Sequence, residues 1–170
     1  SIYLNSKLIA TLTETTYTLH NLTEGANNIT ITAYDKAGNM GSNSVLVYVD
    51  VKAPVVHIEI VEGTLVNTET VNVRWSGHDN ESWIESYSIY LNGELIETVN
   101  NTVSAFTVEG LTEGVNTITV VAYDAAGNKG SDKAVVTVDL TPPEAVFISP
   151  ANNSYLHGTV DIKFTFSDTH

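Results

Sequence analysis

The clearest pattern along the chain is a two-residue alternation of hydrophobic and polar positions, interrupted every 8–12 residues by turn-forming residues. The strongest example covers residues 116–124, where Ile118, Val120 and Ala122 share one face. Such alternation is typical of β-strands with one buried face. The 3.6-residue periodicity of an amphipathic helix is missing, so the sequence predicts an all-β protein.

Residues 51–141 contain enough of these segments for one complete domain. The predicted strands are 55–61, 71–75, 86–91, 94–98, 103–108, 116–124 and 131–139. Asn92-Gly93 is a strong hairpin signal because both residues tolerate positive φ. Residues 77–83 are expected to form a polar loop, and Trp75 alternates with Val71 and Val73 as a core residue would. Seven short strands in about 90 residues predict an immunoglobulin-like Greek-key β-sandwich.

The pattern also repeats. Residues 22–50 and 111–139 are identical at 18 of 29 positions without a gap, at an offset of 89 residues. The same offset relates residues 70–75 to 159–164, while residues 2–6 match 89–93 at an offset of 87. We therefore predict tandem Ig-like repeats. Residues 1–50 would be the back part of one repeat, 51–141 a complete repeat, and 142–170 the first two strands of another.

Two motifs in these repeats resemble a known group of proteins. The AYDxAGN turn at residues 33–39 and 122–128, and the VxVDxTPP joint at 136–143, are similar to Ig-like repeats of large bacterial and archaeal surface proteins. That group includes adhesin stalks, S-layer proteins and accessory modules of secreted hydrolases. The resemblance implies repeats that act as spacers or lattice units, often stiffened by calcium near the joints. It is specific for the fold and weak for function.

The charge of the chain narrows the choice of partners. Seven Lys and Arg stand against 20 Asp and Glu, for a net charge of −13. Such acidity disfavours a nucleic-acid partner and an anionic membrane surface. No apolar run approaches the ~20 residues that cross a bilayer. The sequence shows no secretion signal, so we expect any signal or anchor of an exported protein to lie outside these residues.

Enzymatic chemistry finds little support in the sequence. There is no cysteine, and no GxSxG, HExxH or glycine-rich phosphate loop. The histidines are scattered singly, as residues His20, His57, His78, His157 and His170. We predict that the chain is not an enzyme and binds no cofactor other than calcium.

Calcium is the most serious candidate ligand, because it prefers carboxylate and carbonyl oxygens. One candidate site is the joint, where Asp50 and Asp139 end the last strand of a repeat and meet the loop carrying Asp79 and Glu81 of the next. The other is the AYD turn, where Asp35 would meet Asn39, or Asp124 would meet Asn128. In the turn, the competing interpretation is that Asp and Asn bond only to their own backbone.

Surface modification and sugar binding are further hypotheses. The candidate glycosylation sites are Asn21, Asn28, Asn80, Asn100 and Asn152. Trp83 lies in a polar loop and is the one aromatic residue that suggests contact with polysaccharide. A single tryptophan does not make a carbohydrate site.

The chain begins and ends within a repeat, and this leaves two interpretations open. Residues 1–50 and 142–170 together make about one repeat, and each part alone would leave hydrophobic strands with unpaired edges. Either the chain is a window on a longer array, or the strands at 144–166 of one copy complete the sandwich of another copy, head to tail.

We therefore expect a structural protein outside a prokaryotic cell: a filament subunit, surface stalk or S-layer-like element whose partner is itself. The alternative is a polysaccharide-binding accessory module of a secreted hydrolase.

Overall fold

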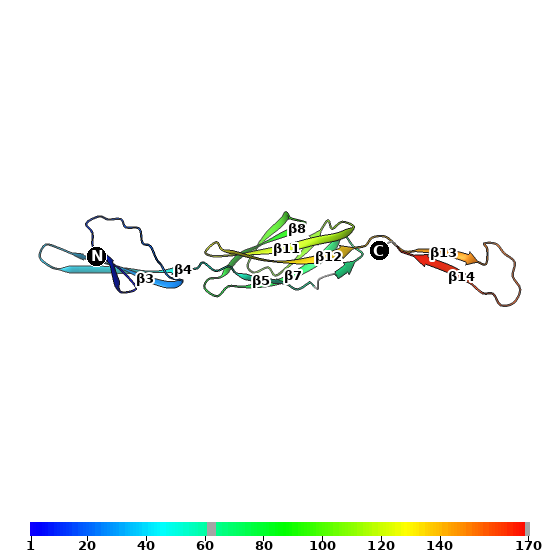
Figure 1. Ribbon diagram of the computed structural model, residues 1–170, viewed down its shortest axis with the longest axis horizontal. Helices are drawn as coiled ribbons and strands as arrows, with labels where there is room; N and C mark the ends of the chain where they lie inside the picture. Colours follow the sequence, from blue (N-terminus) through cyan, green and yellow to red (C-terminus); the bar gives the residue numbers. More distant parts are fainter. Residues whose placement is uncertain (61–63, 169–170) are drawn as a thin grey trace.

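The computed structural model describes residues 1–60 and 64–168, and within them every regular element is a β-strand. The predicted all-β class is confirmed. Figure 1 shows three parts in a row: a sheet near the N-terminus, a central sandwich and a C-terminal hairpin. Val61, the last residue of a predicted strand, and His170 lie outside the described residues. In the described part of the chain, no helix is long and apolar enough to cross a membrane.

The N-terminal part is one antiparallel sheet with the strand order β2-β1-β3-β4. Its strands are β1 (Ile2–Leu4), β2 (Lys7–Ala10), β3 (Gly25–Tyr34) and β4 (Met40–Val49). The two long strands pair from Gly25 with Val49 to Tyr34 with Met40. Residues 11–24, between β2 and β3, form no strand.

The central part is a sandwich of two sheets. The first sheet has the order β10-β7-β5, from Ala105–Glu109, Thr70–His78 and Val55–Ile58. The second has the order β6-β12-β11-β8-β9, from Thr64–Val66, Lys129–Val138, Gly114–Asp124, Ile84–Leu91 and Glu94–Asn100. The predicted Ig-like sandwich is confirmed here. The sequence did not predict β6, which pairs in parallel with the end of β12.

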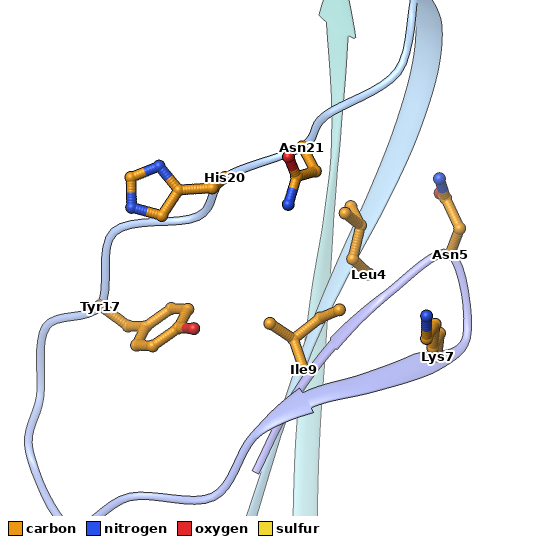
Figure 2. A pocket seen from close by; sticks show the side chains of 7 residues that line it. All are labelled: Leu4, Asn5, Lys7, Ile9, Tyr17, His20 and Asn21. Carbon is orange, nitrogen blue, oxygen red and sulfur yellow. The ribbon is translucent and has the colours of Figure 1, made fainter.

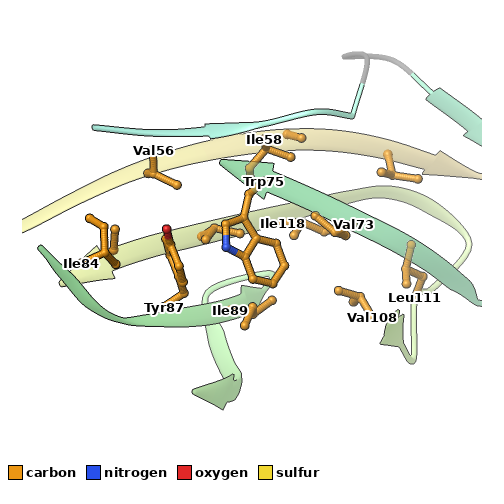
Figure 3. Packing of buried hydrophobic residues seen from close by; sticks show 14 of the residues in the cluster. Val56, Ile58, Val73, Trp75, Ile84, Tyr87, Ile89, Val108, Leu111 and Ile118 are labelled. Atoms are coloured by element: carbon orange, nitrogen blue, oxygen red, sulfur yellow. The ribbon is translucent and has the colours of Figure 1, made fainter. Parts of the chain in front are cut away.

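The core of the sandwich lies between these sheets, and Trp75 is its largest fully buried side chain. Figure 3 shows Trp75 pointing from β7 toward Ile89 and Ile118, with the Tyr87 ring beside it. The Trp75 and Tyr87 rings meet edge to face at 5.6 Å between centroids. Ile118, Val120 and Ala122 are fully buried, as the alternation predicted.

The loop predicted at residues 77–83 is wrong for its first two residues. Gly77 and His78 extend β7 and pair with Val56 and Val55. An added Cβ at position 77 would lie 2.5 Å from the Tyr87 hydroxyl, so any larger residue there would have to displace the Tyr87 side chain. The glycine therefore marks a close approach between the two sheets and not a turn.

A buried asparagine fixes the loop before each long strand. The Asn116 side chain donates to the carbonyls of Thr112 at 2.6 Å and Gly114 at 3.1 Å, and accepts from the Thr112 amide at 3.1 Å. Asn27 makes the same bonds with Thr23 and Gly25, 89 residues earlier. These bonds satisfy the polar groups of a tight loop, so both long strands begin in the same way.

The last part is the hairpin of β13 (Glu144–Ser149) and β14 (Lys163–Ser167). It pairs Glu144 with Ser167 and Phe147 with Phe164. In the central sandwich, the positions 89 residues earlier pair in the same way, Val55 with His78 and Ile58 with Trp75.

Candidate functional site

Three aspartates meet where the N-terminal sheet joins the central sandwich. Asp50 follows β4, Asp79 follows β7, and Asp124 ends β11. One carboxylate oxygen from each lies within 4.8 Å of the others. Asp50 and Asp79 are partly buried and Asp124 is 1% exposed. We call Asp50, Asp79 and Asp124 the joint cluster.

The loop after β7 holds Asp79 in place. Its Oδ1 accepts the backbone N–H groups of Glu81 and Ser82, both at 2.9 Å. The Ser82 amide, the largest cause, and the Glu81 amide lower the pKa of the Asp79 carboxyl, because both bonds favour the ionised form. The Ser82 hydroxyl donates to Asp50 Oδ2 at 2.5 Å, so this loop is tied to the end of β4.

The AYD turn of the sandwich supplies the third carboxylate. Asp124 Oδ1 accepts the amides of Ala126 and Asn128 at 2.9 and 2.8 Å, and its Oδ2 accepts from Asn128 Nδ2 at 2.9 Å. Asn128 Nδ2 also donates to the Asp50 carbonyl at 3.1 Å. The two sites that the sequence separated, joint and turn, are therefore one place in the fold.

The other candidate ligands lie elsewhere. Asp139 is at the opposite end of the sandwich, because β11 and β12 are antiparallel and Asp139 follows β12. Its Oδ1 accepts the Thr141 amide at 3.0 Å. Asp35 lies in an exposed turn, where the Asn39 side chain and backbone amides lower the pKa of its carboxyl.

A second set of charges crosses the same joint. Lys52 Nζ lies 3.3 Å from Glu81 Oε1 and 3.6 Å from Glu24 Oε1. The hydrogen bond to Glu81 is the largest cause that raises the pKa of the Lys52 ammonium group. Glu24 precedes β3 and Glu81 follows β7, so Lys52 links the N-terminal sheet to the sandwich. Glu81 thus pairs with a lysine, whereas the sequence placed it among the calcium ligands.

The joint cluster has the donor chemistry that a hard cation requires. All three groups offer oxygen, and the Asp50 carbonyl and the Ser82 hydroxyl lie beside them. Their carboxylates also accept several hydrogen bonds from the chain, which hold them in position. The sequence missed Asp124 as a joint residue, along with Ser82, Asn128 and Lys52. The AYDxAGN turn lies at the opposite end of its hairpin from the VD of its own repeat, so no local pattern in the sequence linked Asp124 to Asp50.

The remaining candidates are surface residues. All five candidate glycosylation asparagines are exposed: Asn21, Asn28, Asn80, Asn100 and Asn152. Trp83 is 67% exposed, whereas Trp75 is 2% exposed in the core, as predicted. His57 Nδ1 lies 3.3 Å from Asp132 Oδ2; His57 is exposed and Asp132 is partly buried.

Fold and joint together define an immunoglobulin-like β-sandwich protein. The family model described as "Bacterial Ig-like domain (group 3)" matches residues 11–94. The chain therefore carries a bacterial Ig-like domain. The match begins in the N-terminal part and ends within the central sandwich, so it crosses the joint.

Two curated proteins are similar over most of this chain. Chitinase A1 of Niallia circulans is 31% identical over 148 residues, which are 81% of this chain and 21% of that protein. Bacillopeptidase F of Bacillus subtilis (strain 168) is 28% identical over 148 residues, 86% of this chain and 10% of that protein. The chain thus spans about a fifth of the length of the first relative and a tenth of the length of the second.

Among solved structures, the fibronectin(III)-like modules of Clostridium thermocellum CbhA align with a TM-score of 0.49 and 23% identity, over 81% of this chain and 75% of that one. An endo-beta-1,4-mannanase from Thermotoga petrophila aligns with a TM-score of 0.42 and 15% identity, over 53% of this chain and 20% of that one.

Proposed function

We propose that this chain is a non-catalytic, extracellular accessory region of a larger secreted hydrolase, and that it acts as a stiff spacer made of tandem Ig-like units. The observation that carries this proposal is the pair of relatives. One is named as a chitinase and the other as a peptidase, and each is similar to more than four fifths of this chain, at 81% and 86%. A region common to two such different enzymes is poorly suited to recognise the substrate of either.

Side-chain contacts across the joint support the proposal that the spacer is stiff. Asn128 and Ser82 bond to Asp50, and Lys52 lies between Glu24 and Glu81. These contacts restrain bending more than the linker of five residues between β4 and β5 would by itself. Pro54 lies in the same joint and fixes its own φ. The β3–β4 and β11–β12 hairpins pair in the same register, 89 residues apart. This similarity favours the view that successive joints are built alike.

Polysaccharide contact is the second candidate, and Trp83 is the observation that favours it, since so large an exposed aromatic ring suits stacking on a sugar. Retention on insoluble chitin and on cellulose separates the two candidates. The spacer proposal expects the same low retention for the wild type and for Trp83→Ala. If the wild type is retained on the polysaccharide and Trp83→Ala is not, the function is sugar binding and the spacer proposal is wrong.

We also propose that the joint cluster binds calcium, held by Asp50, Asp79 and Asp124. A bound cation would offset the repulsion among the three carboxylates and restrain the joint further. Calcium at a hundredfold excess over its dissociation constant stabilises the folded state by about 2.7 kcal/mol. We therefore expect thermal unfolding to shift upward by several degrees between EDTA and excess calcium.

The control for calcium is Asp79→Asn, which keeps an acceptor for the Glu81 and Ser82 amides but removes one charge. Its unfolding temperature should respond much less to calcium. Asp35→Asn, in the exposed turn, should respond as the wild type does. An identical calcium response in the wild type and Asp79→Asn would show that the cluster is held by its hydrogen bonds alone.

A further inference from the structure

The turn between β8 and β9 carries the only Asn-Gly pair in the sequence, Asn92-Gly93. Both residues have positive φ, 52° for Asn92 and 89° for Gly93, and both are exposed to water. The pair suits a two-residue hairpin turn. It also has a chemical reactivity that the turn itself does not use.

Glycine after asparagine leaves the side-chain amide open to attack by the main chain. The Gly93 nitrogen can form a bond to Asn92 Cγ while the Cγ–Nδ2 bond breaks. Nδ2 then leaves as ammonia, with the proton that the Gly93 nitrogen gives up, and a five-membered imide ring remains. Water opens this ring at either carbonyl and leaves aspartate or isoaspartate at position 92. A glycine favours the first step because it has no side chain to shield its nitrogen.

The fold holds the Asn92 amide in place. Its Oδ1 accepts the Thr117 amide at 2.8 Å, and its Nδ2 donates to Asn116 Oδ1 at 3.2 Å. The Asn92 main-chain N–H also donates to the Thr117 carbonyl at 2.8 Å. Attack by Gly93 needs a free Cγ and a departing Nδ2, so it breaks the side-chain bonds to β11. The closed turn therefore protects Asn92, and an opened turn does not.

The N-terminal sheet contains the same turn with a different second residue. Asn5, shown in Figure 2 in the turn between β1 and β2, has a φ of 50°. Its Oδ1 accepts the Asn28 amide at 2.8 Å, and its Nδ2 donates to Asn27 Oδ1 at 3.4 Å. The next residue is Ser6, with a φ of 68°. This turn is thus built without glycine, and the serine side chain shields the nitrogen that would attack.

Deamidation would damage the contact that the Asn92 side chain makes. Asn116 is fully buried, and its Nδ2 donates to the carbonyls of Thr112 at 2.6 Å and Gly114 at 3.1 Å. Asn116 therefore cannot turn its amide around without losing both bonds. A carboxylate at position 92 would place an oxygen against Asn116 Oδ1, acceptor against acceptor. Isoaspartate would also lengthen the main chain within a two-residue turn.

We propose that Asn92 is a deamidation site controlled by the fold. The closed β8–β9 hairpin protects the side-chain amide, and opening of the hairpin exposes it to Gly93 and to water. The product cannot restore the contact with Asn116, so each modified chain keeps a permanent record that its hairpin has opened. This inference does not depend on the proposed spacer function.

Peptide mapping by mass spectrometry tests the proposal on the whole chain. Samples are kept in one mildly alkaline buffer, with and without guanidinium chloride, and aspartate and isoaspartate are measured at positions 92 and 5. Three hydrogen bonds should keep the turn closed for more than about nine tenths of the time. Asn92 should therefore react at least tenfold faster in denaturant than in the folded chain. In denaturant, Asn92 should also react at least tenfold faster than Asn5.

Gly93→Ser is the matched variant for the reactive pair, because it copies the Asn5-Ser6 turn that the chain already contains. It should slow the reaction at Asn92 in denaturant at least tenfold. Equal rates at Asn92 in the folded and the denatured chain would overturn the protection by the fold. Equal rates at Asn92 and Asn5 in denaturant, or no effect of Gly93→Ser, would overturn the role of Gly93.

Asn92→Asp imitates one product and tests the damage to the contact with Asn116. Its unfolding equilibrium constant should rise about tenfold at neutral pH. Asn67→Asp adds the same charge at an exposed asparagine of the same sandwich and should leave that constant unchanged. If the two variants unfold alike in guanidinium chloride, a carboxylate at position 92 does no harm and the proposed record of opening is wrong.

Discussion

Substitution of Gly130 by alanine should destabilise the central sandwich severely for so small a change. The ideal Cβ would lie 1.8 Å from the Pro54 carbonyl oxygen, whereas real Cβ contacts are essentially never shorter than 3.0 Å. The start of β5 must therefore move away by more than 1 Å. That movement strains the pairing of Val55 with His78 and of Val56 with Gly77.

The magnitude follows from what such a shift disrupts. Overpacking in a well-packed region costs typically 1–3 kcal/mol. A backbone carbonyl cannot rotate aside as a flexible side chain can, so we expect about 3 kcal/mol for Gly130→Ala. Urea unfolding, followed by tryptophan fluorescence, reports this directly, because Trp75 lies in the core between the sheets.

The matched control is Gly41→Ala, where the added Cβ meets nothing within 4 Å. This variant should unfold within about 0.5 kcal/mol of the wild type, as an exposed substitution does. If Gly130→Ala unfolds at the same urea concentration as Gly41→Ala, the result would contradict the close contact between Gly130 of β12 and the start of β5.

Two further predictions concern polar groups of the sandwich. Asn116→Ala removes a fully buried side chain that bonds to Thr112 and Gly114, and should cost about 2–3 kcal/mol in chemical unfolding; a cost below 0.5 kcal/mol would show that the loop holds without it. The Ile58 amide, the largest cause, lowers the pKa of Asp132 in the fold, so this carboxylate stabilises the fold above its ordinary pKa of 3.8 and loses that contribution as the pH falls through its folded pKa. The stability difference between the wild type and Asp132→Ala should therefore be larger at pH 7 than at pH 2.5, and an equal difference at both would contradict the reasoning.

The sequence predicted the central sandwich well where alternation was strict. Ile118, Val120 and Ala122 fell in the core because a two-residue period leaves only one face for them. It misread Gly77 as part of a loop, since glycine at a close approach and glycine in a turn look alike in a sequence. Strand β6 was missed because its three residues pair only through their place beside β12.

The joint cluster was predicted in part. Asp50 and Asp79 were expected to meet because a strand end and the loop of the following unit lie at one end of a sandwich. Asp124 was assigned to a separate turn, because 74 residues separate it from Asp50 and no local pattern shows that β11 ends at the joint. Asp139 ends the next repeat, and it lies at the opposite end of the sandwich, just before the β13–β14 hairpin. Such pairings depend on topology, which a single sequence does not contain.

The central claim is that the joint between the N-terminal sheet and the sandwich is stiff. The chain has no cysteine, so Lys36→Cys and Glu97→Cys place two spin labels uniquely, one on each side of the joint and both at exposed positions. Pulsed electron spin resonance on the doubly labelled chain, diluted with unlabelled protein, then gives the distribution of distances across the joint. We predict one narrow distribution that widens when Lys52→Ala removes the link between Glu24 and Glu81. A broad distribution in the parent chain, unchanged by Lys52→Ala, would show a flexible tether and contradict the spacer function.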